Sequence, residues 1–405
     1  MRIKALVTAV WMGMLLAMAG WAQAVEVKNL YRTAIEVPDR SDESLRQGNQ
    51  QALAEIVIRV SGDARALEAP DIQQAMAAPE RYIDQFSFDR QVRMNPETGL
   101  PEPAFLLNVS FNSRGINQLV RRAGLPIWAT NRAEVLLWLV IEDEQGRRLV
   151  TADSAPELTE ILMTQAARRG LPLAFPINDL EDQLAVTAGD IWGLFMDPVV
   201  AASQRYAPGA VLVGKVYPPV DGNVRGAWAY RMDDNQQFLE TKGELLDSVL
   251  AQAINFSADQ LAAKYAVVLG EGDSDFIWLA IEGVATLTDF AELTAYLDKL
   301  VAVKQANLDR LQEANTRFRV YLESDVENLK QLLKLDKKLI ELESVAAPVG
   351  VNLAVQGDQI TIAGNGVMAP PPGEVLPVVE EPVAPPAVEL RYHWYRTYVS
   401  EVSSP

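Results

Sequence analysis

The chain has 405 residues, of which 54 are acidic and 36 basic, and its formal net charge is −18 at pH 7. This balance argues against nucleic acid and anionic lipid surfaces as partners, because both favour proteins with clustered Lys and Arg. The chain has no cysteine and a single histidine, His393, so it can form no disulfide and cannot assemble the sites that zinc, copper or non-haem iron prefer. Its length is ample for two or three domains held by hydrophobic cores.

Residues 1–24 have the order of a secretory signal peptide. Arg2 and Lys4 precede an apolar run from Ala5 to Ala19, and the small-residue pattern Ala22-Gln23-Ala24 follows. The run is shorter than the roughly 20 residues that a membrane-spanning helix needs. We therefore expect secretion through the inner membrane, cleavage after Ala24 and a location in the periplasm. An uncleaved signal is the alternative, and it would be the chain's one attachment to a membrane.

Residues 25–126 are predicted to form an N-terminal α/β module. A strand in "EVKNLYRTAIEV" precedes the helix "SDESLRQGNQQALAEIVIRVSG", in which apolar residues recur at helical spacing and Gly62 stands at the C-terminal end. A hairpin follows, because apolar and polar residues alternate on both sides of the turn "NPETGLPEP". A helix over residues 114–123 ends at Gly124.

Residues 132–270 are predicted to form a middle α/β module. Val135–Ile141 is unbroken apolar sequence, which is typical of a strand covered on both faces. Helices over Pro156–Arg169, Asp190–Tyr206 and Glu244–Val268 alternate with the strands "LPLAFP" and "GAVLVGKV", and Asp221-Gly222 indicates a tight hairpin. This alternation predicts a sheet with crossover helices.

Residues 275–363 are predicted to form a ferredoxin-like module with the order β-α-β-β-α-β. The second helix is expected to begin at Ser324, with Glu327 completing a capping box, and to turn Ile340 inward. The segments "VNLAV" and "ITIA" flank Gly357-Asp358 and are expected to form a terminal hairpin.

The pattern "WLVIE" at 138–142 returns as "WLAIE" at 278–282. Each copy is predicted to lie in the first strand of a βα unit, with apolar residues in a core and the Glu at the solvated end. We therefore interpret the repeat as one solution to one packing problem, and not as a duplicated binding site.

The C-terminal region differs in composition from the three modules. Residues 369–388 contain seven prolines and few residues that can pack, so they are predicted to be an extended spacer. In the tail, residues 389–405, Leu390, Tyr392 and Trp394 share one face if the chain is extended. Such a strand either folds back onto an edge of its own sheet or adds to the sheet of a partner.

No assembled set of catalytic, cofactor-binding or metal-binding residues is found in the sequence. The sequence "GxSxG" does not occur, "GEG" and "GNG" are isolated, and 54 acids make any pair of carboxylates uninformative. Aromatic residues are the remaining candidates for an interaction surface, although residues of this kind are more often core. They are Trp192, Phe195, Tyr206, Trp228, Tyr230, Tyr392 and Trp394.

Several stretches resemble a family of secreted proteobacterial proteins grouped as DUF2066. They include "KNLYRTAIEVPDRSDESLRQGNQQALAEIVIRVSGD", "GLPIWATNRAEVLLWLVIED" and "GDIWGLFMDPVVAASQRYAPGAVLVGKV", and the resemblance covers about Val25 to Leu342. The spacing of Gly124, Trp128, Arg132, Trp138 and Arg205-Tyr206 carries it, although Ala133 stands where family members commonly have proline. The middle module is also similar to the TolB N-terminal region. Neither resemblance implies an activity or a catalytic residue.

Three functions remain open for such a chain. The preferred one is a non-catalytic periplasmic protein of the Gram-negative cell envelope, an interaction or assembly module that binds other envelope proteins without a cofactor. The second is a carboxylate-dependent hydrolase of envelope glycan, which requires a deep pocket with two suitably spaced acids. The third is a periplasmic solute-binding protein, which requires a cleft between domains lined by the aromatic residues. Neither the partner nor the oligomeric state follows from the sequence.

Overall fold

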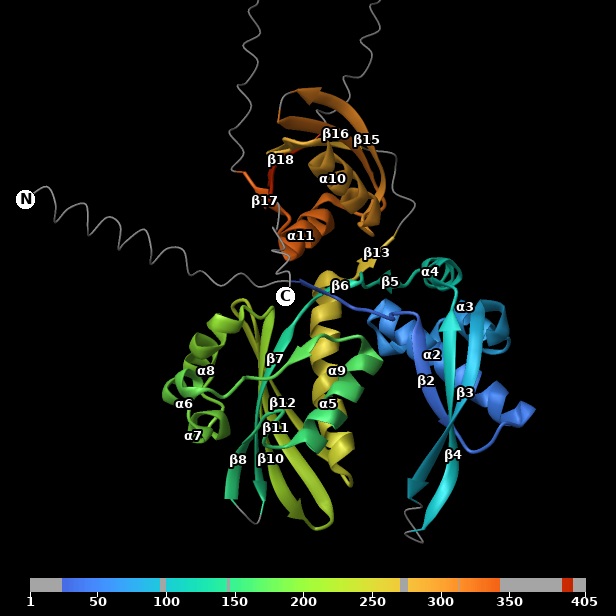
Figure 1. Ribbon diagram of the computed structural model, residues 1–405, viewed down its shortest axis with the longest axis vertical. Coiled ribbons are helices and arrows are strands. Elements are labelled where there is room, and N and C mark those ends of the chain that lie inside the picture. Colours follow the sequence, from blue (N-terminus) through green and yellow to red (C-terminus); the bar gives the residue numbers. More distant parts are fainter. Residues whose placement is uncertain are drawn as a thin grey trace, which may run out of the picture.

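The computed structural model describes residues 24–94, 100–143, 146–269, 276–312, 314–342 and 388–395. Three modules of mixed α and β structure meet around one short segment, residues 126–133 (Figure 1). The fold class is therefore that of several small α/β and α+β modules, as the sequence predicts. The predicted signal peptide lies outside the described residues, apart from Ala24. Within the described part of the chain, no helix has both the length and the apolar character needed to cross a membrane.

The N-terminal module is a three-stranded antiparallel sheet with helices on one face. β2 (Arg32–Val37), β4 (Pro101–Phe111) and β3 (Ile83–Met94) lie in that order, and α2 (Asp42–Ser61) packs against them. The Ser41 side chain caps α2, and Gly62 ends it in the left-handed region. The predicted helix and hairpin are thus confirmed. The remaining elements are η2 (Ala64–Glu68), α3 (Pro70–Met76), η3 (Pro79–Tyr82) and α4 (Ser113–Arg122).

The middle module is a mixed sheet covered on both faces. Its main path runs β12-β11-β10-β7-β8, with β9 beside β7. The strands are β7 (Val135–Asp143), β8 (Gly146–Val150), β9 (Leu173–Ala174), β10 (Ala210–Val220), β11 (Asn223–Met232) and β12 (Asn235–Gly243). α5 (Pro156–Arg169) and α9 (Leu246–Tyr265) pack on one face, and α6 (Leu180–Ala185), α7 (Ala188–Trp192), α8 (Met196–Ser203) and η4 (Gln204–Tyr206) lie on the other (Figure 1).

Side chains of β7 alternate between the two cores of the middle module. Leu137 and Leu139 belong to the core under α5 and α9, and Trp138 and Val140 belong to the core under α7 and α8. The unbroken apolar run therefore fills both faces of one strand, as predicted.

Three details of the middle module differ from or refine the sequence prediction. The single helix expected over 190–206 is broken at Gly193-Leu194, where Leu194 has a φ of 54°. The strand expected in "LPLAFP" is only the two residues of β9, and β8 was not predicted. The Asp221-Gly222 hairpin is confirmed, and both residues have positive φ, which suits a tight turn between twisted strands.

The third module has the order β-α-β-β-α-β, but its last strand is β17, in a stretch where helix was predicted, and not the expected hairpin. The elements are β14 (Phe276–Glu282), α10 (Leu287–Lys299), β15 (Val303–Gln312), β16 (Asn315–Leu322), α11 (Val326–Asp336) and β17 (Leu339–Glu341). The N-cap of α11 is Asp325, whose side chain accepts from Asn328 N, so the expected Ser324–Glu327 box is not formed. Lys337 ends α11 with a φ of 51°, and Ile340 falls in β17, where it is 41% exposed. The prediction that Ile340 points inward from the helix is therefore wrong.

A C-terminal strand, β18 (Glu389–Trp394), lies inside this sheet. The strand order is β15-β16-β14-β18-β17, so β18 separates β14 from β17, with β14 parallel and β17 antiparallel to it. Leu390, Tyr392 and Trp394 are buried on one face, as their alternation predicts. The tail thus folds back onto its own chain, as an inner strand and not at an edge. The expected hairpin at "VNLAV" and "ITIA" and most of the proline-rich spacer lie outside the described residues.

Two short strand pairs hold the modules together. β1 (Ala24–Glu26) pairs with β6 (Asn131–Ala133), and β5 (Pro126–Ile127) pairs with β13 (Val267–Val268). One continuous hydrophobic cluster includes Ile127 and Val267 together with the cores of the N-terminal and third modules. The three modules are therefore packed on one another and not merely connected by the chain.

Candidate functional site

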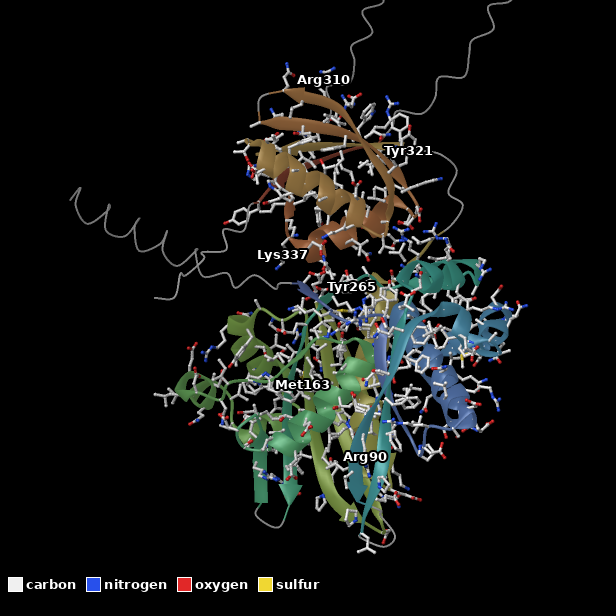
Figure 2. All side chains as sticks on the ribbon, turned by 45° about the vertical axis from the view of Figure 1, so that its right-hand side comes forward. Arg90, Met163, Tyr265, Arg310, Tyr321 and Lys337 are labelled. Carbon is white, nitrogen blue, oxygen red and sulfur yellow. The ribbon has the colours of Figure 1, made fainter. Side chains whose placement is uncertain are left out.

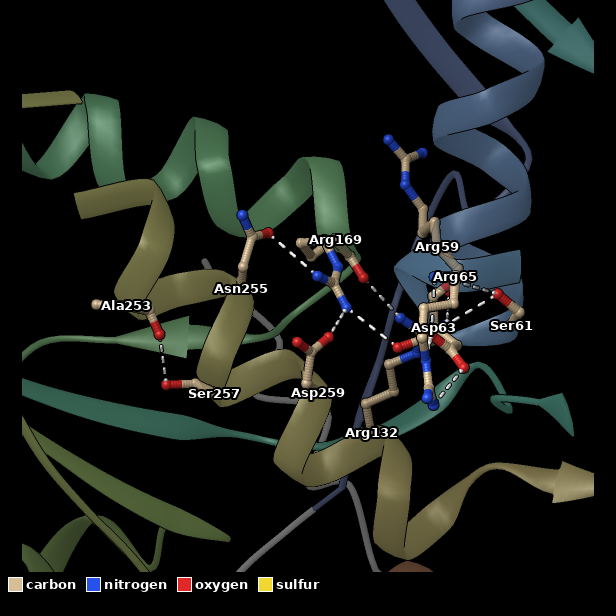
Figure 3. Close-up of polar contacts among 11 residues, drawn as sticks. Arg59, Ser61, Asp63, Arg65, Arg132, Arg169, Ala253, Asn255, Ser257 and Asp259 are labelled. Carbon is tan, nitrogen blue, oxygen red and sulfur yellow. Dashed lines mark hydrogen bonds and ion pairs between the residues drawn. The ribbon is translucent and has the colours of Figure 1, made fainter. Parts of the chain in front are cut away.

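Three buried arginines lie where the N-terminal and middle modules meet (Figure 3). Arg59 in α2, Arg132 in β6 and Arg169 in α5 are 5%, 0% and 6% exposed. The guanidinium of Arg132 donates five hydrogen bonds of 2.8–3.1 Å, and each goes to a backbone carbonyl. The acceptors are Ala129, Arg169, Gly170, Arg59 and Trp128.

The carbonyls around Arg132 explain why an arginine is found there. Those of Arg59 and Arg169 are at the C-terminal ends of α2 and α5, where carbonyls lack helical partners and the helix dipole is negative. A cation satisfies both ends at once. Burial and the nearby Arg59 charge lower the pKa of Arg132 to about 9, so it is still protonated at pH 7. Gly170 is required here, since a Cβ at this position would lie 2.6 Å from Arg132 Nη1.

Arg59 and Arg169 add further contacts between the N-terminal and middle modules. Arg59 pairs with Glu55 at 2.6 Å and donates to the carbonyl of Arg32 in β2. Arg169 pairs with Asp259 of α9 at 2.6 Å and donates to the carbonyl of Gly62 at the end of α2 (Figure 3). The cluster therefore ties α2, β2, α5 and α9 to one another. Its role is to hold two modules in place, because its guanidiniums are already engaged by carbonyls and carboxylates.

A pocket of about 420 Å³ lies where residues 126–133, the central segment, meet the third module. It is the junction pocket of the molecule. The Asn131 side chain donates to the Asp336 carboxylate at 3.1 Å. Burial raises the pKa of Asp336, and burial with the Asp336 charge raises the pKa of Tyr296 well above its usual value. Trp394 Nε1 is buried without a hydrogen-bond partner among the described residues. Glu26 of β1 also lines this pocket, so groups from separate modules converge on it.

The polar groups that line the pocket can hydrogen-bond to a ligand. The carboxyl, phenol and indole groups of the pocket suit hydrogen bonds to a small polar molecule. The hydrogen bond between Asn131 and Asp336 joins an amide to a carboxylate, which is not a nucleophile with its base. No group of three or more His, Cys, Asp or Glu that could hold a metal ion occurs among the residues that the structure describes.

Most of the aromatic residues predicted as a surface are core. Trp228 and Tyr230 lie in the core under α9, and Tyr392 and Trp394 lie in the core of the third module. Trp228 Nε1 donates to Thr241 Oγ1 at 2.9 Å. Trp228, Tyr230 and Tyr392 are therefore not available to a partner in this structure, whereas Trp394 also lines the pocket described above.

The other three aromatics lie on or near the outer helices of the middle module. Trp192 packs edge-on against Tyr217 at 5.3 Å. Phe195 is 60% exposed. Burial and the Asp182 carboxylate raise the pKa of Tyr206 to about 12, and its hydroxyl donates to that carboxylate. Phe195 is thus the one member of the predicted set with a largely free side chain.

The groups of the junction pocket were missed by the sequence analysis. Asp336 is one acid among many near the end of a helix, and Asn131 lies in a short connecting segment. No spacing rule joins them to Tyr296, because Tyr296 and Asp336 end up on different helices of the third module and Asn131 lies outside that module. The resemblance to DUF2066 includes Arg132 but implies no role for it.

Comparison with known proteins gives one match. A family model described as "Domain of unknown function (DUF8605)" matches residues 24–129, the N-terminal module with the start of the central segment. This is a different family from DUF2066, and the match covers less than half of the chain. No curated protein and no solved structure matches.

Proposed function

We propose that the protein is a non-catalytic interaction module of the Gram-negative periplasm, and that it binds envelope proteins through the third module. The observation that carries this proposal is the position of β18. It is joined to β14 by a parallel ladder from Trp278↔Glu389 to Glu282↔His393. Leu390, Tyr392 and Trp394, at alternate positions of β18, pack into the core. Sheets recognise added peptide strands in the same way, through main-chain hydrogen bonds and pockets for alternate side chains.

The chain connection indicates that β18 behaves as an added strand. Leu342 follows β17, and its N–H donates to the carbonyl of Arg391 in β18 at 2.9 Å. Antiparallel neighbours this close can be joined by a two-residue turn. Here the chain instead uses all of residues 343–388 before it returns. A partner strand of similar pattern would find the same ladder at β14 when β18 leaves it.

The absence of cysteine makes a direct test practical. Ala280 and Arg391 face each other across β14 and β18, so Ala280→Cys with Arg391→Cys gives a pair that can lock β18 in place. Crosslinking in the periplasm is then compared between the oxidised pair, the reduced pair and Ala280→Cys alone. We expect a specific crosslinked partner with the reduced pair and the single variant, and its loss on oxidation.

Two outcomes would contradict the proposal. The first is a crosslinking pattern that the lock leaves unchanged, because binding would then not need the β14 ladder. The second is a chain that fractionates outside the periplasm. Intact mass analysis of the same fractions tests the expected start of the mature chain at Val25.

A periplasmic solute-binding protein is the second candidate, because of the junction pocket. Its volume suits a small molecule, and Asp336, Tyr296 and Trp394 supply convergent polar groups. A thermal-shift screen of polar metabolites tests this function. A hit must be lost in Tyr296→Phe and kept in Tyr206→Phe, which changes a tyrosine of the middle module.

A further inference from the structure

Among the residues that the structure describes, helices cover only one face of the sheet of the third module. Ile277, Leu279 and Ile281 of β14 point into the core that α10 and α11 cover. Phe276 and Trp278 alternate with them and lie half-buried on the opposite face. Figure 2 shows Arg310 and Tyr321 on this sheet, at the end of the molecule far from the middle module.

The strand register places arginines in one row across this open face. Ala280 of β14 lies between Arg391 of β18 and Arg317 of β16, and Arg310 of β15 lies opposite Arg317. Neighbouring strands are about 4.8 Å apart. Like charges directly opposite each other destabilise a sheet, so Arg310 and Arg317 favour a negative group between or above them. The small side chain of Ala280 leaves room in the middle of the row.

Two of the guanidiniums on this face, those of Arg317 and Arg319, lie over aromatic rings. Arg319 is opposite Trp278 in register, and its guanidinium lies 4.8 Å from the centre of the Phe276 ring. The Arg317 guanidinium lies 4.0 Å from the centre of the Trp278 ring. Stacking restricts the orientation of a guanidinium, so less side-chain entropy is lost when it binds a carboxylate.

The charges of this face are only partly balanced. Glu282 pairs with Arg391 at 2.9 Å, and Glu389 approaches Arg317 at 4.0 Å. No ion pair with a carboxylate is found for Arg310 or Arg319 within the described residues. In a chain with a net charge of −18, four arginines on one sheet face are a local excess of positive charge. The ligand that complements them is an anion.

We propose that the open face of the third module binds an acidic, extended segment of a partner protein through Arg310, Arg317 and Arg319. Carboxylates match the guanidinium in bidentate geometry. Guanidiniums already lie over Phe276 and Trp278, so those ring faces are not free to stack on a base or a sugar. That the anion belongs to a protein rests on the function proposed above.

Binding of a fluorescein-labelled oligoglutamate to the full chain tests this proposal by anisotropy at low salt. Arg310→Gln with Arg319→Gln removes two cations but keeps side chains of similar length. We expect this double variant to bind at least about tenfold more weakly, and wild-type binding to weaken as salt rises. The control is Arg46→Gln, an exposed arginine of α2, which should bind like the wild type. Circular dichroism and the melting temperature show whether each variant is folded.

Three results would overturn the proposal. They are equal binding by the double variant and the wild type, equal binding of oligoglutamine, and binding of polygalacturonate or oligo-dT in the absence of oligoglutamate binding. The last would identify the face as a site for a glycan or a nucleic acid. If oligoglutamate fails while crosslinking still responds to the β14–β18 lock, only the anion site falls and the sheet-edge function stands.

Discussion

The two larger sheets contain the same pentapeptide pattern in opposite surroundings. In "WLVIE" of β7, Trp138 is 1% exposed under α7 and α8, and its Nε1 donates to Ser203 Oγ at 2.9 Å. In "WLAIE" of β14, Trp278 is half-buried beneath the guanidinium of Arg317, on a face that no described helix covers. One tryptophan contributes to a core and the other supports a cationic surface, so the interpretation of the repeat as one solution to one packing problem is wrong for Trp278.

The difference shows that the helices packed on a sheet decide whether alternate side chains of a strand belong to a core or to the surface. Helices lie on both faces of the middle sheet, so all of Val135–Ile141 is buried. The described helices of the third module, α10 and α11, lie on one face of its sheet, and the other face carries polar and aromatic side chains. The third sheet also takes its inner strand from the end of the chain. It is therefore the part of the molecule suited to exchange a strand or to bind a ligand.

Removal of residues 388–405 should have the largest effect, because it should destabilise the third sheet and leave the middle sheet unchanged. A chain that ends at Ala387 lacks Leu390, Tyr392 and Trp394, and burial of each such side chain contributes roughly 1.5–3 kcal/mol. We expect the third module to lose on the order of 5 kcal/mol of stability. Hydrogen exchange should accelerate at the amides of β14 and stay unchanged in β7.

A chain that ends at Tyr395 is the matched control, because it keeps β18. It should exchange like the full chain in both sheets. Unchanged protection of β14 in the shorter chain would show that β18 contributes little to the sheet.

The two tryptophans of the repeated pattern test the contrast directly. Trp138→Ala should lower the free energy of unfolding by roughly 3–5 kcal/mol, since it empties a core and leaves Ser203 without its donor. Trp278→Ala should lower it by about 1 kcal/mol, because a half-buried ring and its cation–π contacts are lost. Urea unfolding measures both values. Similar losses at the two positions would mean that the open face is in fact a core, and Trp→Phe variants extend the test if Trp138→Ala does not fold.

Local patterns predicted the elements well, since they depend on near neighbours. The covered strand at Val135–Ile141, the cap at Gly62 and the common face of Leu390, Tyr392 and Trp394 all follow from spacing. The insertion of β18 between β14 and β17 could not be predicted, because pairing across 343–388 leaves no local signal.

The candidate sites were predicted less well, for a related reason. Trp138 and Trp278 have nearly identical neighbours in sequence, so only the helices above them distinguish core from surface. The row of Arg310, Arg317 and Arg391 depends on the register of four strands. The burial of Asp336 depends on how the third module packs against the central segment.

The smallest expected effect is on the pH dependence of stability, and it comes from Asp336, which lies where the third module packs against residues 126–133. Burial raises its folded-state pKa above 3.8, so the fold disfavours the carboxylate. Its unfavourable contribution is absent below pH 3.8 and grows as pH rises through the folded-state pKa. Asp336→Asn should therefore be more stable than wild type at pH 7 and equal to it in acid, because the new amide oxygen still accepts from Asn131. The control is Glu240→Gln, which removes a carboxylate at an exposed position of β12. A thermal unfolding series across pH measures both differences, and a stability loss in Asp336→Asn at pH 7 would mean that its charge holds the junction together.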